Sequence, residues 1–381
     1  MASSTCVLTA LLVGLGLPAW VGPAAGQTCT PQSIATHPGA WKENPANLAL
    51  ARETAPAALH ARILKRIEPV AAMFREAYPT PHGTAAEGYA SIRLFGRELV
   101  GGPAQYGYVS LYKTWLCPKS TGKPSLADET GNWAYVYVNS LSSMLKSLSD
   151  DSLEVDGRPA RVWLLARRAG TLRGEPLYEP WLGFGGGGAL VFAKEGALPW
   201  KVLSRKQYLA MSAAWHRNQR AKGNQAADQL VRNLEKAVEE AKQSPPGPNK
   251  ATIVAEMERA LADAKAQTAA GRAKGGAATS GDLKAIDDYL AAHSAADLAQ
   301  PAILGPNAGL VFAGEFGTEA DGGHQVVVID PGYFRRDLPA DAAQLVTLLW
   351  RSEKDSPASS AWREGFEARF PIEKLRAMVG R

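Results

Sequence analysis

The chain has 381 residues, of which 46% are hydrophobic and 21% are charged, a balance typical of a folded protein long enough for two domains. Its 42 Lys and Arg residues exceed its 37 Asp and Glu residues, which gives a formal net charge of +5 spread over the whole length. Because nucleic-acid-binding proteins concentrate basic residues on one face, this dilute charge argues against a nucleic-acid partner.

The first 26 residues have the features of a secretory signal peptide. Residues 5–21 form an uncharged apolar run, and the small residues Ala24 and Gly26 fit the cleavage rule, so we expect cleavage after Gly26. An uncleaved membrane anchor is the alternative, but the run is short and is interrupted by Pro18 and two glycines. We therefore predict an exported protein, periplasmic or extracellular, with no membrane span in the mature chain.

Cysteine usage agrees with export. Once Cys6 leaves with the signal, the mature chain keeps Cys29 and Cys117. In an oxidising compartment such a pair is most simply one disulfide, whereas in a reducing cytoplasm both would stay free thiols. We predict the disulfide.

The mature chain up to residue 203 is predicted to mix helix with antiparallel sheet. Residues 56–78 carry apolar side chains at helical spacing, after which the pattern changes to alternation. Strands are expected at residues 91–100, 107–116, 132–139, 160–166 and 189–193, with a short helix at 140–148 and a loop at 174–188.

Residues 204–271 lack strand signals and are predicted to form a long antiparallel helical hairpin, a coiled-coil-like arm. A turn rich in Pro, at 244–249, separates two amphipathic runs. The apolar seam is expected to consist of Leu230, Leu234, Ala237 and Ala241 on the first helix, and of Ile253, Met257, Ala260 or Leu261, and Ala264 on the second. Trp200, Tyr208 and Trp215 near the base indicate that the root of the arm packs on the sheet domain.

The remaining chain is predicted to return to mixed structure. Residues 269–281 are small and are expected to be a flexible linker. A helix at 282–293, a hairpin from 309–313 and 325–330, a strand at 344–350 and terminal helices at 362–369 and 372–379 should follow. The fold class is α+β, with antiparallel sheet before and after the inserted hairpin and with segments 1–26, 27–203, 204–271 and 272–381. Whether the last segment completes the N-terminal domain or forms a second sheet stays open.

Motifs with catalytic potential lack their expected context. Residues 183–188 match G-x-G-x-x-G, but strand-like residues follow where a dinucleotide site needs a helix. Two S-x-x-K matches, at Ser120 and Ser143, lack the downstream partners of an acyl-enzyme. The six histidines are scattered without paired metal-ligand spacing. We therefore predict no cofactor and no metal site, and we leave the catalytic residues unassigned.

A group of aromatic residues carries the functional signal. Trp133, Tyr135 and Tyr137 alternate along one predicted strand and must share a face, while Tyr108 and Tyr112 lie on the neighbouring strand. Exposed rings in a row would suit a glycan or an extended peptide, whereas buried rings would be core. We favour the core interpretation and keep these five residues as candidate ligand-binding positions.

Two phrases, PWKVLSRKQYL at residues 199–209 and DPGYF at 330–334 with Leu338-Pro339 after it, resemble exported bacterial proteins of uncharacterised families. The resemblance implies export and brings no activity or site residue. We therefore expect an exported binding or interaction protein whose hairpin contacts a protein partner, and we lean against an enzyme. The alternative is a secreted hydrolase whose site assembles only in the fold.

Overall fold

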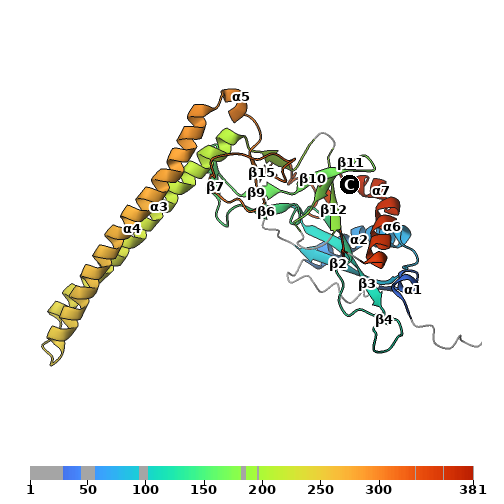
Figure 1. The fold of residues 1–381 in the computed structure, drawn as a ribbon, viewed down its shortest axis with the longest axis horizontal. Helices are drawn as coiled ribbons and strands as arrows, with labels where there is room; N and C mark the ends of the chain where they lie inside the picture. Colours follow the sequence, from blue (N-terminus) through green and yellow to red (C-terminus); the bar gives the residue numbers. More distant parts are fainter. Residues whose placement is uncertain are drawn as a thin grey trace, which may run out of the picture.

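The computed structural model describes residues 29–43, 56–93, 102–181, 186–194, 197–330, 332–354 and 356–380. Figure 1 shows a body of sheets and helices from which two long helices project as a rod. The protein is therefore α+β, with antiparallel sheets flanking a long helical hairpin, as the sequence predicts.

The larger sheet contains nine strands within the described residues. Its order is β1 (Trp41–Glu43), β2 (Thr84–Arg93), β3 (Gln105–Leu116), β5 (Trp133–Val138), β16 (Leu345–Ser352), β12 (Gly186–Ala193), β11 (Glu175–Glu179) and β10 (Arg167–Leu172), with β4 (Ser125–Leu126) on β3. Neighbours are antiparallel except β1 and β2. Strand β16 lies between β5 and β12, so the C-terminal segment completes the sheet that the N-terminal segment begins.

Helices cover one face of this sheet. They are α2 (Ala57–Ala77), α6 (Pro357–Arg369) and α7 (Ile372–Arg376), with α1 (Pro31–Ala35) packed beside α6. Their apolar sides enclose Phe74, Trp362 and Phe366 together with rings from the sheet, among them Tyr112 and Trp350. Pro69 lies inside α2, which continues to Ala77.

A second sheet covers the other face near its centre. Its strands are β13 (Trp200–Val202), β15 (His324–Ile329), β9 (Val162–Leu165) and β6 (Leu145–Ser147), with β14 (Ile303–Leu304) on β15; β7 (Leu153–Val155) and β8 (Arg158–Ala160) form a separate ribbon. Trp163 and Val327 of this sheet pack with Leu345 and Leu349 of β16. The body is therefore three layers deep, with β16 in the middle layer.

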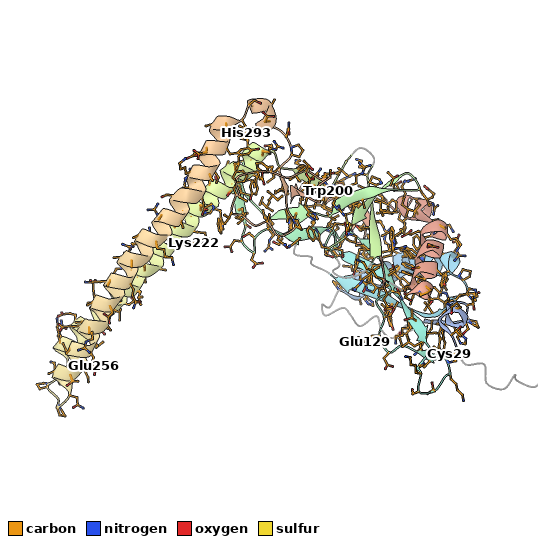
Figure 2. All side chains as sticks on the ribbon, in the orientation of Figure 1. Cys29, Glu129, Trp200, Lys222, Glu256 and His293 are labelled. Carbon is orange, nitrogen blue, oxygen red and sulfur yellow. A yellow bond between two sulfur atoms is a disulfide. The ribbon has the colours of Figure 1, made fainter. Side chains whose placement is uncertain are left out.

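The rod consists of α3 (Arg205–Gln243) and α4 (Lys250–Ala292), followed by the short α5 (Ala295–Leu298). At the root, Tyr208, Leu209 and Ile286 are buried with residues of β9 and β15. In Figure 2, Lys222 lies along the rod and Glu256 lies near its far end, away from the body. The root is thus anchored, as predicted, and the distal part projects.

The seam of the hairpin differs from the prediction at both ends. Leu230 and Ile253 are 52% and 49% exposed, and their neighbours Val231 and Val254 are the less exposed residues. Ala260 is exposed and Leu261 is half-buried, which resolves the alternative on α4. The register between the two helices determines which residues face inward. Three interhelical ion pairs, spaced seven residues apart, mark this register: Asp228 with Arg272, Glu235 with Lys265, and Lys242 with Glu258.

The predicted linker at 269–281 is also wrong, because these residues form the interior of α4. Alanine, which favours helix most strongly, offsets the glycines there. The guanidinium of Arg220 on α3 lies beside Gly276, where an added Cβ would be in ordinary contact with it at 3.4 Å. This part of α4 therefore runs alongside α3, which the composition alone does not reveal.

Three predictions in the body also fail. Residues 140–148 form turns and β6 rather than a helix, because Asn139 has a φ of 58° and turns the chain. The loop expected at 174–188 contains β11 and the start of β12, and β15 pairs with β14 instead of residues 309–313. Of the strand expected at 91–100, β2 reaches Arg93 and residues 94–100 lie outside the described residues.

The predicted disulfide between Cys29 and Cys117 is confirmed. Their Cα atoms are 5.7 Å apart, and the bond ties the chain before α1 to the residue that follows β3. The amide of Cys29 also donates to the carbonyl of Gly122 at 3.1 Å. A crosslink across so many residues stabilises the folded state by about 4 kcal/mol in the chain-entropy description.

A buried carboxylate joins α2 to the segment that precedes β16. The Asp341 side chain is 3% exposed, and its two oxygens accept from Nε of Arg62 and Nε of Arg66, each at 2.8 Å. The Tyr106 hydroxyl donates to the Asp341 carbonyl at 2.7 Å. Burial alone would raise the pKa of this carboxyl, but the hydrogen bonds from the two arginines outweigh burial and lower it.

The Asp341 contacts predict a specific loss of stability in acid. Because its folded-state pKa is lowered, the stabilisation is complete above the unfolded value of about 3.9 and disappears as pH falls through the folded value. Asp341→Asn should lower the free energy of unfolding by about 1–3 kcal/mol at neutral pH, with the deficit shrinking below about pH 3. Urea midpoints of both proteins across this range measure it, and a deficit that stays constant with pH would contradict it.

The revised seam predicts that polar substitutions at two adjacent residues have unequal effects on the stability of the arm. Val231→Gln should place a polar group between the helices and lower the stability of the arm by about 1–3 kcal/mol, whereas Leu230→Gln should change it by less than about 0.5 kcal/mol. Thermal melts followed by the helical circular dichroism signal measure both. Equal effects, or a larger effect of Leu230→Gln, would show that the seam is misplaced.

Candidate functional site

The five candidate aromatic residues divide between two faces of the larger sheet. Tyr108 and Tyr112 point into the core under the helices, where they are 6% and 0% exposed, and the Tyr112 ring lies 4.6 Å from that of Trp362. Trp133, Tyr135 and Tyr137 share the opposite face and are half-buried. The five side chains therefore do not form one surface, although the three on β5 do lie together.

Neighbouring rings of the row on β5 are in contact, edge to face between Trp133 and Tyr135 and stacked between Tyr135 and Tyr137. The ring centroids of Trp133 and Tyr135 are 4.6 Å apart, and those of Tyr135 and Tyr137 are 5.3 Å apart. Tyr135 and Tyr137 pack against the cluster between the two sheets, and the Arg351 guanidinium lies 6.0 Å from the Trp133 ring. The row is thus partly core, and a ligand role for it stays a prediction.

The buried histidines have contacts of a structural kind. Nδ1 of His324 lies 2.9 Å from the carbonyl of Leu165, and burial lowers the pKa of His324. His216, at the root of the arm, has its Nδ1 3.4 Å from an oxygen of Asp282. Within the described residues, neither imidazole bonds to a serine or cysteine, which a nucleophilic hydrolase would require.

The described residues contain neither a metal-binding cluster nor a membrane-spanning helix. No cluster of three or more His, Cys, Asp and Glu side chains suited to a metal ion occurs among the described residues. In the same part of the chain, no helix has both the length and the apolarity to cross a membrane.

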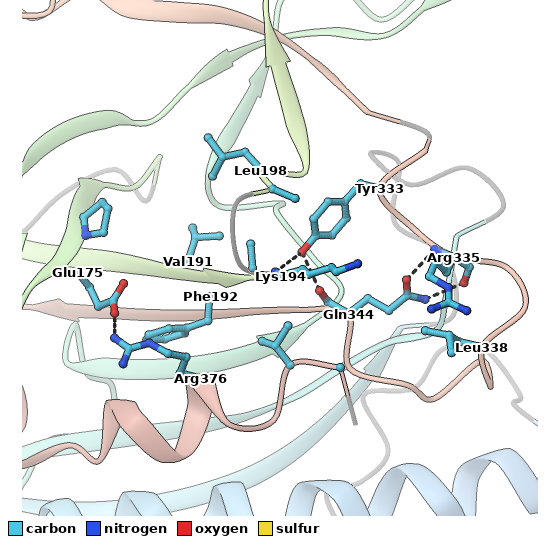
Figure 3. A pocket seen from close by; sticks show the side chains of 15 residues that line it. Glu175, Val191, Phe192, Lys194, Leu198, Tyr333, Arg335, Leu338, Gln344 and Arg376 are labelled. Carbon is cyan, nitrogen blue, oxygen red and sulfur yellow. Dashed lines mark hydrogen bonds and ion pairs between the residues drawn. The ribbon is translucent and has the colours of Figure 1, made fainter.

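A cleft of about 890 Å³ opens where β12 ends and β16 begins. Its walls come from β11, β12, residues 197–198, the segment before β16 and the chain after α7. The apolar lining includes Val191, Ala193, Leu198, Leu338 and Val379. Figure 3 shows Glu175 and Arg376 at one end and Arg335 and Gln344 at the other. Its size and mixed lining are those of sites for small molecules.

Hydrogen bonds within the chain fix the wall of the cleft around Tyr333. Its hydroxyl accepts from the amide of Lys194 at 3.1 Å and donates to the carbonyl of Gln344 at 2.8 Å. The Gln344 amide group donates to the carbonyl of Arg335 and accepts from the Arg335 amide. Burial raises the pKa of Tyr333, so the phenol stays a donor at neutral pH.

The charged groups of the cleft are unequally paired. The Arg335 guanidinium is held by Asp337, and that of Arg376 by Glu175 and Glu373. The ammonium of Lys194 makes neither an ion pair nor a hydrogen bond with any described residue. One cation is therefore available to an incoming ligand.

Sequence reasoning missed this cleft. It is assembled from segments that are separated by more than a hundred residues and meet only because β16 lies beside β12. The one signal in the sequence was the phrase at 330–334, which contains Tyr333. Nothing in that phrase indicates that its tyrosine bonds to Lys194 and Gln344.

Comparison with known proteins gives no assignment. No family model matches the chain, and neither does any curated protein or solved structure.

The wall of the cleft predicts a difference between two tyrosines. Tyr333→Phe removes a hydroxyl with two partners and should lower the free energy of unfolding by about 1–2 kcal/mol. Tyr178→Phe is the matched control, because the half-buried Tyr178 hydroxyl has no hydrogen-bond partner in the described chain; it should cost less than about 0.5 kcal/mol. Urea unfolding of both variants measures the difference, and equal costs would contradict it.

Proposed function

We propose that this is an exported binding protein whose helical arm contacts a protein partner in the cell envelope or outside the cell. The observation that carries the proposal is the projection of α3 and α4 from the body (Figure 1). At 1.5 Å per residue, the 39 residues of α3 alone give a length of about 58 Å. Nothing in the described body needs a helical pair of that reach for its own packing.

Two large apolar side chains of the arm are exposed outside its seam. Val231, Leu234 and Val238 account for the packing of α3 on α4, so they are not available to a partner. Leu230 and Ile253 lie outside that seam and are each about half exposed. Each offers apolar area that a protein partner can cover, which makes the two positions the places to probe the arm for a contact.

Export is supported by two independent features. The N-terminal 26 residues have the pattern of a signal peptide, and the chain holds a disulfide between Cys29 and Cys117. The competing function, a secreted hydrolase, has weaker support because neither buried imidazole, that of His216 or that of His324, bonds to a serine or cysteine among the described residues.

Photo-crosslinking from single positions tests the partner surface. A photoreactive residue at Leu230 or Ile253, in protein exported by its native host, should give a discrete adduct with the same partner. Leu198 and Val311 on the body are 55% and 51% exposed and serve as matched controls that should give none. Adducts from the body positions alone would overturn the proposal.

A shortened arm gives a second, independent test. Deleting residues 229–242 and 258–271 removes two seven-residue repeats from each helix and keeps the natural turn; the Asp228–Arg272 pair then takes the place of Lys242–Glu258. The rod loses about 21 Å. Recovery of the partner should fall about tenfold or more, while the melting of the body stays the same. Unchanged recovery would contradict a role for the shaft.

A further inference from the structure

The cleft at the junction of β12 and β16 has an apolar floor that the fold leaves uncovered. Leu198 is 55% exposed, more than any other large apolar residue of the described chain. Val191, Ala193, Leu338 and Val379 line the same cavity. Covering such surface removes apolar area from water, which stabilises a complex by about 25 cal/mol for each Å².

The polar groups of the cleft define the head group of a ligand. The Tyr333 hydroxyl and the Gln344 side-chain amide each make two hydrogen bonds within the chain, and both arginines are paired with carboxylates. Lys194 is left as the one lining cation without a partner in the described chain. In Figure 3 its side chain extends toward Gln344 and Arg335, away from the end where Glu175 lies. One unpaired ammonium matches one negative charge.

An extended peptide is a poor match for this cleft. Strand β12 is paired with β16 along one edge, and on its other edge β11 pairs with Ala189 and Leu190, so along the cleft only residues 191–193 lack a described strand partner on that edge, a row shorter than the usual strand of about five or six residues. The charge arrangement also disfavours a phosphate dianion, which would need more than one unpaired donor group. A carboxylate with an apolar body satisfies both the floor and Lys194.

We propose that this cleft binds a free medium-chain fatty-acid carboxylate, with the carboxylate on the Lys194 ammonium and the hydrocarbon chain across Val191, Ala193 and Leu198. Because the wall around Tyr333 is already held by hydrogen bonds within the chain, binding requires little ordering of the protein. The site lies on the body and is independent of the proposed contact of the arm with a protein partner.

Titration calorimetry of the full mature chain with decanoate tests the proposal. Decanoate should bind with one site per chain, whereas decyltrimethylammonium, which carries a similar chain and the opposite charge, and acetate, which lacks the chain, should each bind at least tenfold more weakly. Absence of decanoate binding, or equal binding of the cationic amphiphile, would overturn it. So would recruitment of the protein to anionic phospholipid vesicles without binding of free decanoate.

Matched variants locate the site. Lys194→Gln and Leu198→Ser should each weaken decanoate binding about tenfold. Lys206→Gln, an exposed lysine on α3, and Val311→Ser, an apolar residue of similar exposure on the body, should change it less than about twofold. If all four variants bind like the unaltered protein, decanoate binds elsewhere and the assignment to this cleft fails.

The shortened arm separates this inference from the proposed function. Protein lacking residues 229–242 and 258–271 should bind decanoate with unchanged affinity, even though it loses its partner. Loss of decanoate binding in that variant would contradict a site confined to the body. If the variant binds decanoate and also recovers the partner as before, only the proposed role of the arm is contradicted.

Discussion

The whole molecule depends on one strand, β16, pairing on both sides with strands that precede the arm. Residues 341–350 are buried without interruption, and β16 takes β5 on one edge and β12 on the other. Asn139 sets its register: the side-chain oxygen accepts from the amides of Gln344 and Leu345, and the nitrogen donates to the carbonyl of Ala342. Without β16, β5 and β12 would each have one unpaired edge. Because β16 follows the arm in the sequence, the larger sheet is completed only by residues that come after the arm.

The long arm does not prevent the later pairing of β16, because the two ends of the arm lie next to each other. It connects β13 to β15, which are antiparallel neighbours in the second sheet, and the amide of Arg205 donates to the carbonyl of Gln300 where the two helices leave the body. The helical pair is therefore a very long hairpin connection, closed at its base by the sheet and along its shaft by its own seam. Because its ends are already adjacent, its length adds little to the entropy of bringing β15 and β16 into place.

The sequence predicts what is decided locally and misses what is decided by distant neighbours. The alternation at 133–138 and the apolar spacing of α2 identify one strand and one helix correctly, since one face of each is buried. Leu230 was a better hydrophobic match to the seam than Val231, but the register with α4 determines which of two adjacent residues faces inward. Trp133, Tyr135 and Tyr137 were predicted to share a face because side chains alternate along a strand. That Tyr112 lies on the opposite face of the sheet depends on the register between β3 and β5.

The cleft has the same origin as the closure of the sheet. The backbone amide of Gln344 donates to the Asn139 side chain, its carbonyl accepts from the Tyr333 hydroxyl, and its side chain bonds to the Arg335 backbone, so the residue through which Asn139 sets the register of β16 also forms the cleft wall. A wall built on such a buried junction cannot relax without loosening the central strand, and it therefore stays in shape without a ligand. The side chains of Lys194 and Leu198 are not part of this buried junction, because neither is buried. The cleft thus combines a rigid wall with a lysine and a leucine that can be replaced without cost to the fold, and this separation of roles allows binding there to be measured apart from stability.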